Sequence, residues 1–80
     1  MVVRIRLFAV MAQMAGAGSV MLELPDGSPV QAIRPALERQ FAKMAWPAGT
    51  MLAVNQEYAG ENVILQSGDE VAIIPPVSGG

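Results

Sequence analysis

The residues best suited to chemistry stand at the C-terminal end of the sequence. Residues 67–74 read as a turn followed by a β-branched strand. Pro75 and Pro76 donate no backbone hydrogen bond, so the strand should end there and continue as an extended arm. Gly79 and Gly80 carry no side chain and could enter a channel too narrow for a Cβ atom. A frayed glycine-rich end is the ordinary alternative, but it does not need a stiff proline stem. We therefore predict that the Gly80 carboxylate is the reactive group.

The composition excludes most other chemistry. Cysteine and histidine are absent, which removes disulfides, the usual zinc ligands, thiol nucleophiles and the commonest general base. Five scattered Lys and Arg residues and a formal net charge of −2 give no footprint for nucleic acid or anionic lipid. Asp26, Asp69 and Glu70 are too scattered to predict a metal site. We expect no metal or cofactor bound by this chain, so its chemistry needs a partner's side chains or the chain terminus.

The hydrophobic runs do not indicate a membrane or secreted protein. No run approaches the eighteen or so apolar residues of a membrane-spanning helix. Residues 1–18 faintly resemble a secretory signal, with two arginines, an apolar run and Ala-Gly-Ala. The uninterrupted apolar run, residues 7–12, is shorter than such a signal requires. We expect a cytoplasmic protein without membrane association.

Hydrophobic periodicity predicts five strands, one main helix and one short helix. The short helix follows the first strand and should end at Gly16. Ser28 is placed as the N-cap of the main helix, whose apolar stripe runs to Met44, and Pro35 should kink it. The predicted strands are residues 2–8, 19–24, 50–55, 57–58 and 70–74, and the predicted helices are residues 9–15 and 28–44.

This order predicts one domain over residues 1–80 with a projecting tail at residues 75–80. The 52% hydrophobic content is that of a folded globule. One helix packed on a mixed, mainly antiparallel sheet is the β-grasp arrangement, an α+β fold similar to ubiquitin. The first and last strands both need burial on the helix side, so they should lie side by side and parallel.

Strand alternation predicts an exposed apolar patch beside the tail. Phe8 and Ile74 fall on the parity that points away from the helix, and Tyr58 lies on the short edge strand. Single exposed apolar residues are ordinary. Three large ones near one arm favour a protein interface.

Three stretches resemble a known family. Ala53-Val54-Asn55-Gln56, Gly68-Asp69-Glu70-Val71-Ala72 and Pro75-Pro76-Val77-Ser78-Gly79-Gly80 are similar to the small subunits of molybdopterin synthase, the sulfur carriers of molybdenum cofactor biosynthesis. The element order agrees over nearly all 80 residues. Pro35 and Trp46-Pro47 depart from the family pattern, but they bear on the helix and a loop and not on the tail.

The resemblance implies a mechanism. An E1-like partner would use ATP to adenylate Gly80, and sulfur from a donor protein would convert the adenylate into a thiocarboxylate. The tail, Pro75, Pro76, Val77, Ser78 and Gly79, would then thread into the active site of the synthase large subunit. There the sulfur would pass to a cyclic pyranopterin monophosphate. Phe8, Tyr58 and Ile74 would dock the partners, and the family's complex holds two large and two small subunits.

Two alternatives remain open at this point. The chain could be a sulfur carrier of the thiamine type or a ubiquitin-like protein modifier, which would share the activation step but differ in the acceptor. It could also be a plain β-grasp binding module whose final glycines are incidental. The sequence does not indicate which E1-like enzyme would load the tail or whether the isolated protein is monomeric.

Overall fold

The computed structural model describes residues 1–44, 46–60 and 62–76. Its centre is a five-stranded sheet in the order β2-β1-β5-β3-β4. β1 and β5 are parallel, whereas the other three neighbouring pairs are antiparallel. The strands are β1 (Val2–Arg6), β2 (Ser19–Glu23), β3 (Met51–Val54), β4 (Glu57–Tyr58) and β5 (Glu70–Ile74). This topology confirms the predicted β-grasp fold.

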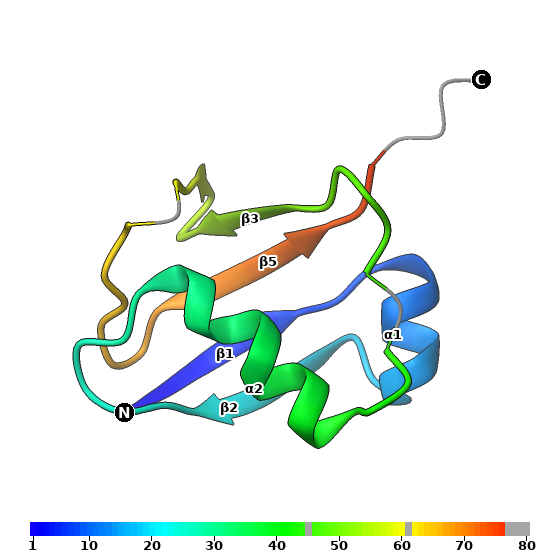
Figure 1. Cartoon of the computed structure of the whole chain (residues 1–80), viewed down its shortest axis with the longest axis horizontal. Coiled ribbons are helices and arrows are strands. Elements are labelled where there is room, and N and C mark those ends of the chain that lie inside the picture. The colour runs from blue at the N-terminus through cyan, green and yellow to red at the C-terminus, as the bar shows by residue number, and fades with distance from the viewer. Residues whose placement is uncertain (45, 61, 77–80) are drawn as a thin grey trace.

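Two α-helices accompany the sheet (Figure 1). α2 (Ile33–Gln40) crosses one face, and α1 (Ala9–Ala15) lies at the end of the sheet where β5 finishes. α1 ends at Gly16, whose φ of 73° is the left-handed conformation predicted for the residue after this helix. None of the helices in the described ranges is long and apolar enough to cross a membrane.

The core lies between the sheet and α2. Alternate residues of β1 and β5 point into it, because successive side chains of a strand face opposite sides. α2 contributes residues at helical spacing, and α1 contributes Met11. The fully buried large side chains are Val3, Ile5, Met11, Val30, Ile33, Leu37, Leu65, Val71 and Ile73.

The start of the main helix differs from the sequence prediction. Ser28 does not cap it, because its hydroxyl donates to the Pro25 carbonyl over 2.7 Å and closes a turn. Pro29 forms an antiparallel bridge with Ile64, and Val30 begins a 3₁₀ turn, η1 (Val30–Ala32), that leads into α2. The prediction was wrong because residues 28–30 pair with a segment more than thirty positions away in the sequence.

Pro35 also lies elsewhere in the helix than predicted. α2 begins at Ile33, so Pro35 is its third residue. The first amides of a helix have no partner within the helix, so a missing N–H is tolerated there. The helix does come in two pieces, but they join between Ala32 and Ile33, before the proline.

Candidate functional site

The root of the predicted tail is fixed by the middle strand of the sheet. β5 is hydrogen-bonded to β1 on one side and to β3 on the other, and its alternate residues Val71 and Ile73 are fully buried. Pro75 is half-buried and Pro76 is exposed. Figure 1 shows this end of β5 leading out of the sheet on the side of α1. The predicted reactive residue, Gly80, and the predicted threading residues Val77, Ser78 and Gly79 lie outside the described residues.

Phe8 and Ile74 lie on the outer face of the sheet, opposite α2. β1 and β5 pair in parallel, and Arg6 and Ala72 are their last partners. Phe8 and Ile74 each follow two residues later, so they come level with each other and on the same face as Arg6 and Ala72. The backbone of Phe8 is extended, with φ −132° and ψ 156°, which keeps its side chain on the Arg6 face while Leu7 is buried. The Arg6 guanidinium lies 5.6 Å from the centre of the Phe8 ring, at cation–π distance. The structure therefore brings these two predicted residues to one place beside the tail root.

Tyr58 lies farther from the tail root than the sequence suggested. It is 67% exposed on β4 and pairs with Ala53, so β3 separates it from β5. Met51, two residues from Ala53 on β3, lies nearer the tail root: it pairs with Ile74 and is 50% exposed. We call Phe8, Met51 and Ile74 the tail-root patch, with Tyr58 at its margin. Met51 was missed because strand parity places it outward but only the β3–β5 register places it opposite Ile74.

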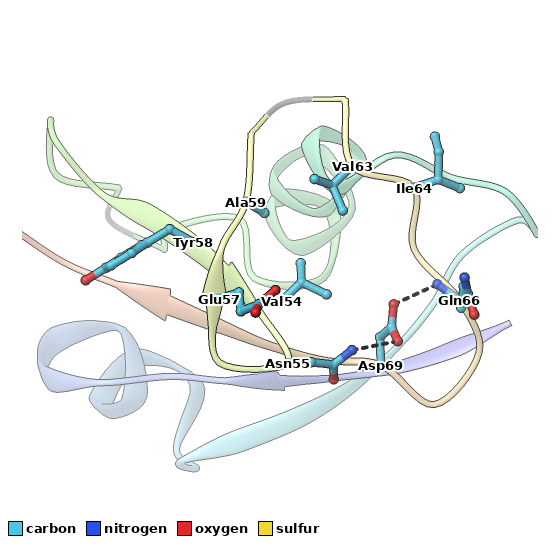
Figure 2. Close-up of a pocket in the computed structure, with 9 residues that line it drawn as sticks. All are labelled: Val54, Asn55, Glu57, Tyr58, Ala59, Val63, Ile64, Gln66 and Asp69. Carbon is cyan, nitrogen blue, oxygen red and sulfur yellow. Dashed lines mark hydrogen bonds between the residues drawn. The ribbon is translucent and has the colours of Figure 1, made fainter.

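Two of the motifs that carried the family resemblance meet at the other end of β5. The Asn55 side-chain amide donates to Asp69 Oδ1 over 3.0 Å, and Asn55 Oδ1 accepts from the Glu70 amide over 3.1 Å. Asp69 Oδ2 accepts from the Gln66 amide over 2.8 Å. These contacts tie the β3–β4 turn to the turn before β5 (Figure 2). Asn55 and Asp69 thus have a structural role at the point where β5 begins.

A shallow groove of about 300 Å³ opens beside this network. Its walls include Val63 and Ile64 on one side and Glu57 on the other (Figure 2). The Tyr58 side chain points away from the other lining residues. The groove lies at the start of β5, whereas the tail leaves from its end. In the part of the chain that the structure describes, no three acidic, histidine or cysteine residues gather as a metal-binding group.

Comparison with known proteins identifies the family. The ThiS family profile matches residues 5–80. The molybdopterin synthase sulfur carrier subunit of Arabidopsis thaliana is 35% identical over 98% of this chain and 82% of its own length. SAMP1 from Haloferax volcanii superposes with a TM-score of 0.85 at 26% identity, over the full length of both chains. A solved complex holds subunits 1 and 2 of the Helicobacter pylori molybdopterin-converting factor. One of its chains superposes on this chain with a TM-score of 0.70 over the full length of both chains. The identity is 23%, so this likeness is in fold alone. The chain belongs to the ThiS family.

Proposed function

We propose that this chain is the sulfur-carrier subunit of a molybdopterin synthase and that Gly80 carries the sulfur. The observation that carries the proposal is the Pro-Pro-Val-Ser-Gly-Gly ending directly after the middle strand of the sheet, in a ThiS-family chain. Near-full-length relatives from Arabidopsis thaliana and Dictyostelium discoideum, at 35% and 37% identity, bear the name of this subunit. A folded domain whose last two residues carry no side chain suits delivery of one terminal group into another protein.

The proposed loading takes place on the terminal carboxylate. A carboxylate is a poor electrophile, so its oxygen first attacks the α-phosphorus of ATP on an E1-like enzyme, and pyrophosphate leaves. The terminal sulfur of a donor protein's persulfide then attacks the acyl carbon, and AMP leaves. A thiol cleaves the resulting acyl disulfide, forms a disulfide with the donor cysteine and releases the Gly80 thiocarboxylate. General acid and base groups come from the partners, because this sequence contains no Cys or His.

The proposed transfer takes place in the large subunit. Residues 75–80 would enter its active site, where the thiocarboxylate sulfur would attack a side-chain carbon of the cyclic pyranopterin phosphate and a C–O bond at that carbon would break. Water would then hydrolyse the resulting thioester, which leaves the sulfur on the pterin and restores the Gly80 carboxylate. Two such transfers supply both sulfurs of the dithiolene. The Helicobacter pylori complex of subunits 1 and 2 supports pairing of this fold with a second subunit. The tail-root patch is the surface that we propose for docking, because its apolar side chains surround the point where the tail leaves.

Intact mass spectrometry tests the proposal. The purified chain is incubated with ATP, an E1-like enzyme and a persulfide donor, and the expected result is the mass change of one oxygen replaced by sulfur. A variant lacking Gly80 should show no such change and should keep the wild-type melting temperature, because the core is built from residues before the tail. Absence of the mass change in the wild-type chain would leave only the plain binding module.

A second candidate, a protein modifier, has one observation in its favour. The chain matches SAMP1 from Haloferax volcanii over the full length of both proteins. A second solved structure from this organism bears the full name small archaeal modifier protein 1. The two functions share Gly80 activation and differ in the acceptor. Supplying the loaded chain with precursor pterin and the large subunit should yield the dithiolene, whereas a modifier would become linked to lysine side chains.

A further inference from the structure

The tail stem rests on a turn that precedes β3. The β3–β5 ladder ends at the pair Met51–Ile74, and neither Pro75 nor Pro76 has the N–H needed to extend it. The two segments nevertheless stay together for two more residues. A Cβ atom built on Gly49 would lie 3.4 Å from Pro76 Cβ and 3.8 Å from Pro76 Cγ. These are ordinary van der Waals distances, so the proline ring packs on the turn at Gly49.

The turn under the stem is internally braced. The Thr50 hydroxyl donates to the Pro47 carbonyl over 2.6 Å, and the Thr50 amide donates to the same oxygen over 3.1 Å. Gly49 has a φ of 88°, which L side chains rarely adopt, so glycine suits this turn on conformational grounds as well. These bonds give the turn a defined shape against which the proline can pack.

The segment before the turn is anchored to the body of the domain. Trp46 is half-buried and packs against the core cluster. The Arg34 guanidinium of α2 lies 5.2 Å from the centre of the Trp46 ring, a cation–π contact. The turn is thus held between the core on one side and the start of β3 on the other.

We propose that the turn of residues 47–50 is a positioning element for the reactive tail and that Gly49 is its positioning residue. Because Pro76 packs on the turn at Gly49, the shape of this turn sets the place where the chain leaves the domain at Pro76. Gly80 follows Pro76 by four residues in the sequence, so the place of the stem limits where the carboxylate can reach. Misplacement of a reacting group by about 1 Å can reduce a rate by about a hundredfold. This inference rests on the proposed function, because it assigns Gly49 to the delivery of the same terminal group.

A matched pair of variants separates positioning from folding. Gly68 has nearly the same φ, 87°, but nothing lies within 4 Å of a Cβ built there. Asparagine tolerates positive φ better than other side chains, so Gly49→Asn and Gly68→Asn should both fold and carry similar backbone strain. Only the first places new atoms against Pro76. Thermal unfolding of both variants shows whether their stabilities match.

The readout is the initial rate of thiocarboxylate formation, followed by intact mass with ATP, the E1-like enzyme and the persulfide donor. We expect Gly49→Asn to lower kcat by about tenfold and Gly68→Asn to stay within about twofold of wild type. Because the docking surface is intact, KM should change little for either variant. In a Pro76→Ala background the Gly49→Asn substitution should cost no further activity, since the ring that it displaces is gone.

Two results overturn the inference. Equal rates for the Gly49 and Gly68 variants, with the wild-type chain loaded normally, would leave the proposed function standing and remove the positioning role. Full additivity of Gly49→Asn and Pro76→Ala would do the same. Failure of the wild-type chain to load would overturn the proposed function, and this inference with it.

Discussion

At the scale of single residues, Asn55 and Asp69 join two of the stretches on which the family resemblance rests, residues 53–56 and 68–72. Each side chain makes two hydrogen bonds, and together they hold the β3–β4 turn against the turn before β5. The Asn55 backbone amide adds a 2.7 Å bond to the Glu70 carbonyl. The network lies at the end of the sheet away from the tail, so its contribution is to stability and not to chemistry.

Loss of the Asp69 carboxylate should weaken the fold. Asp69→Ala removes the acceptors of the Asn55 and Gln66 bonds, and we expect the free energy of unfolding to fall by about 1.5 kcal/mol. Urea denaturation measures this change. Gln66→Ala is the matched control and should keep wild-type stability, because Gln66 contributes its backbone amide and carbonyl to these bonds and not its side chain. Equal losses in the two variants would contradict the assignment.

The β3–β4 turn contains a conformational strain that can be relieved. Asn55 and Gln56 have φ values of 51° and 73°, as expected for a two-residue hairpin turn in which both residues have positive φ. Asparagine tolerates this conformation, but glutamine does so less well. Gln56→Gly should therefore raise the free energy of unfolding by about 0.5 kcal/mol, the strain relief exceeding the entropy cost of glycine. Differential scanning calorimetry should show a higher melting temperature, whereas Gln40→Gly in α2 should lower it.

At the scale of elements, the position of a proline in a helix decides its effect. Pro35 falls in the first turn of α2, where it removes a hydrogen bond that the helix does not make. The β-grasp sheet and the helix stripe could be anticipated from periodicity, but the first residue of the helix could not. It depends on the pairing of residues 28–30 with residues 63–65.

A proline substitution series tests this placement. Pro35→Ala should change the free energy of unfolding by less than about 1 kcal/mol, because no helical bond is gained or lost. Glu38→Pro, one turn later in the same exposed region of the helix, should cost about 3 kcal/mol or more, because it removes a bond within the helix. Chemical denaturation measures both. A large gain in stability from Pro35→Ala would show that the proline strains the helix after all.

At the scale of the whole molecule, the core and the proposed docking surface lie on different faces of the sheet. The core lies between the sheet and α2, whereas the tail-root patch lies on the outer face. Phe8 is 39% exposed and, like Ile74, lies outside the core cluster, so its truncation leaves the packing of that cluster in place. Changes on the outer face should therefore affect partner binding more than stability.

Docking variants test this separation. We expect Phe8→Ala and Ile74→Glu to weaken binding to the synthase large subunit by at least about tenfold, since apolar anchors beside the entering tail are lost. The melting temperature should stay close to wild type. Met21→Ala is the matched control, because Met21 is 61% exposed on the same face but lies on the edge strand β2. Isothermal titration calorimetry measures the affinities, and unchanged binding of both patch variants would remove the docking role.

The sequence by itself determined the features that depend on near neighbours in the chain. Alternation predicted the strands and their buried faces, and Pro75 and Pro76 predicted where the last strand ends. The lack of Cys and His in the sequence made Gly80 the predicted reactive residue. Only the tertiary structure decided that Met51 lies opposite Ile74, that Pro76 packs on the turn at Gly49, and that Ser28 closes a turn instead of capping a helix. Each of these depends on the register between distant segments, and local patterns are compatible with several registers until the whole core is packed.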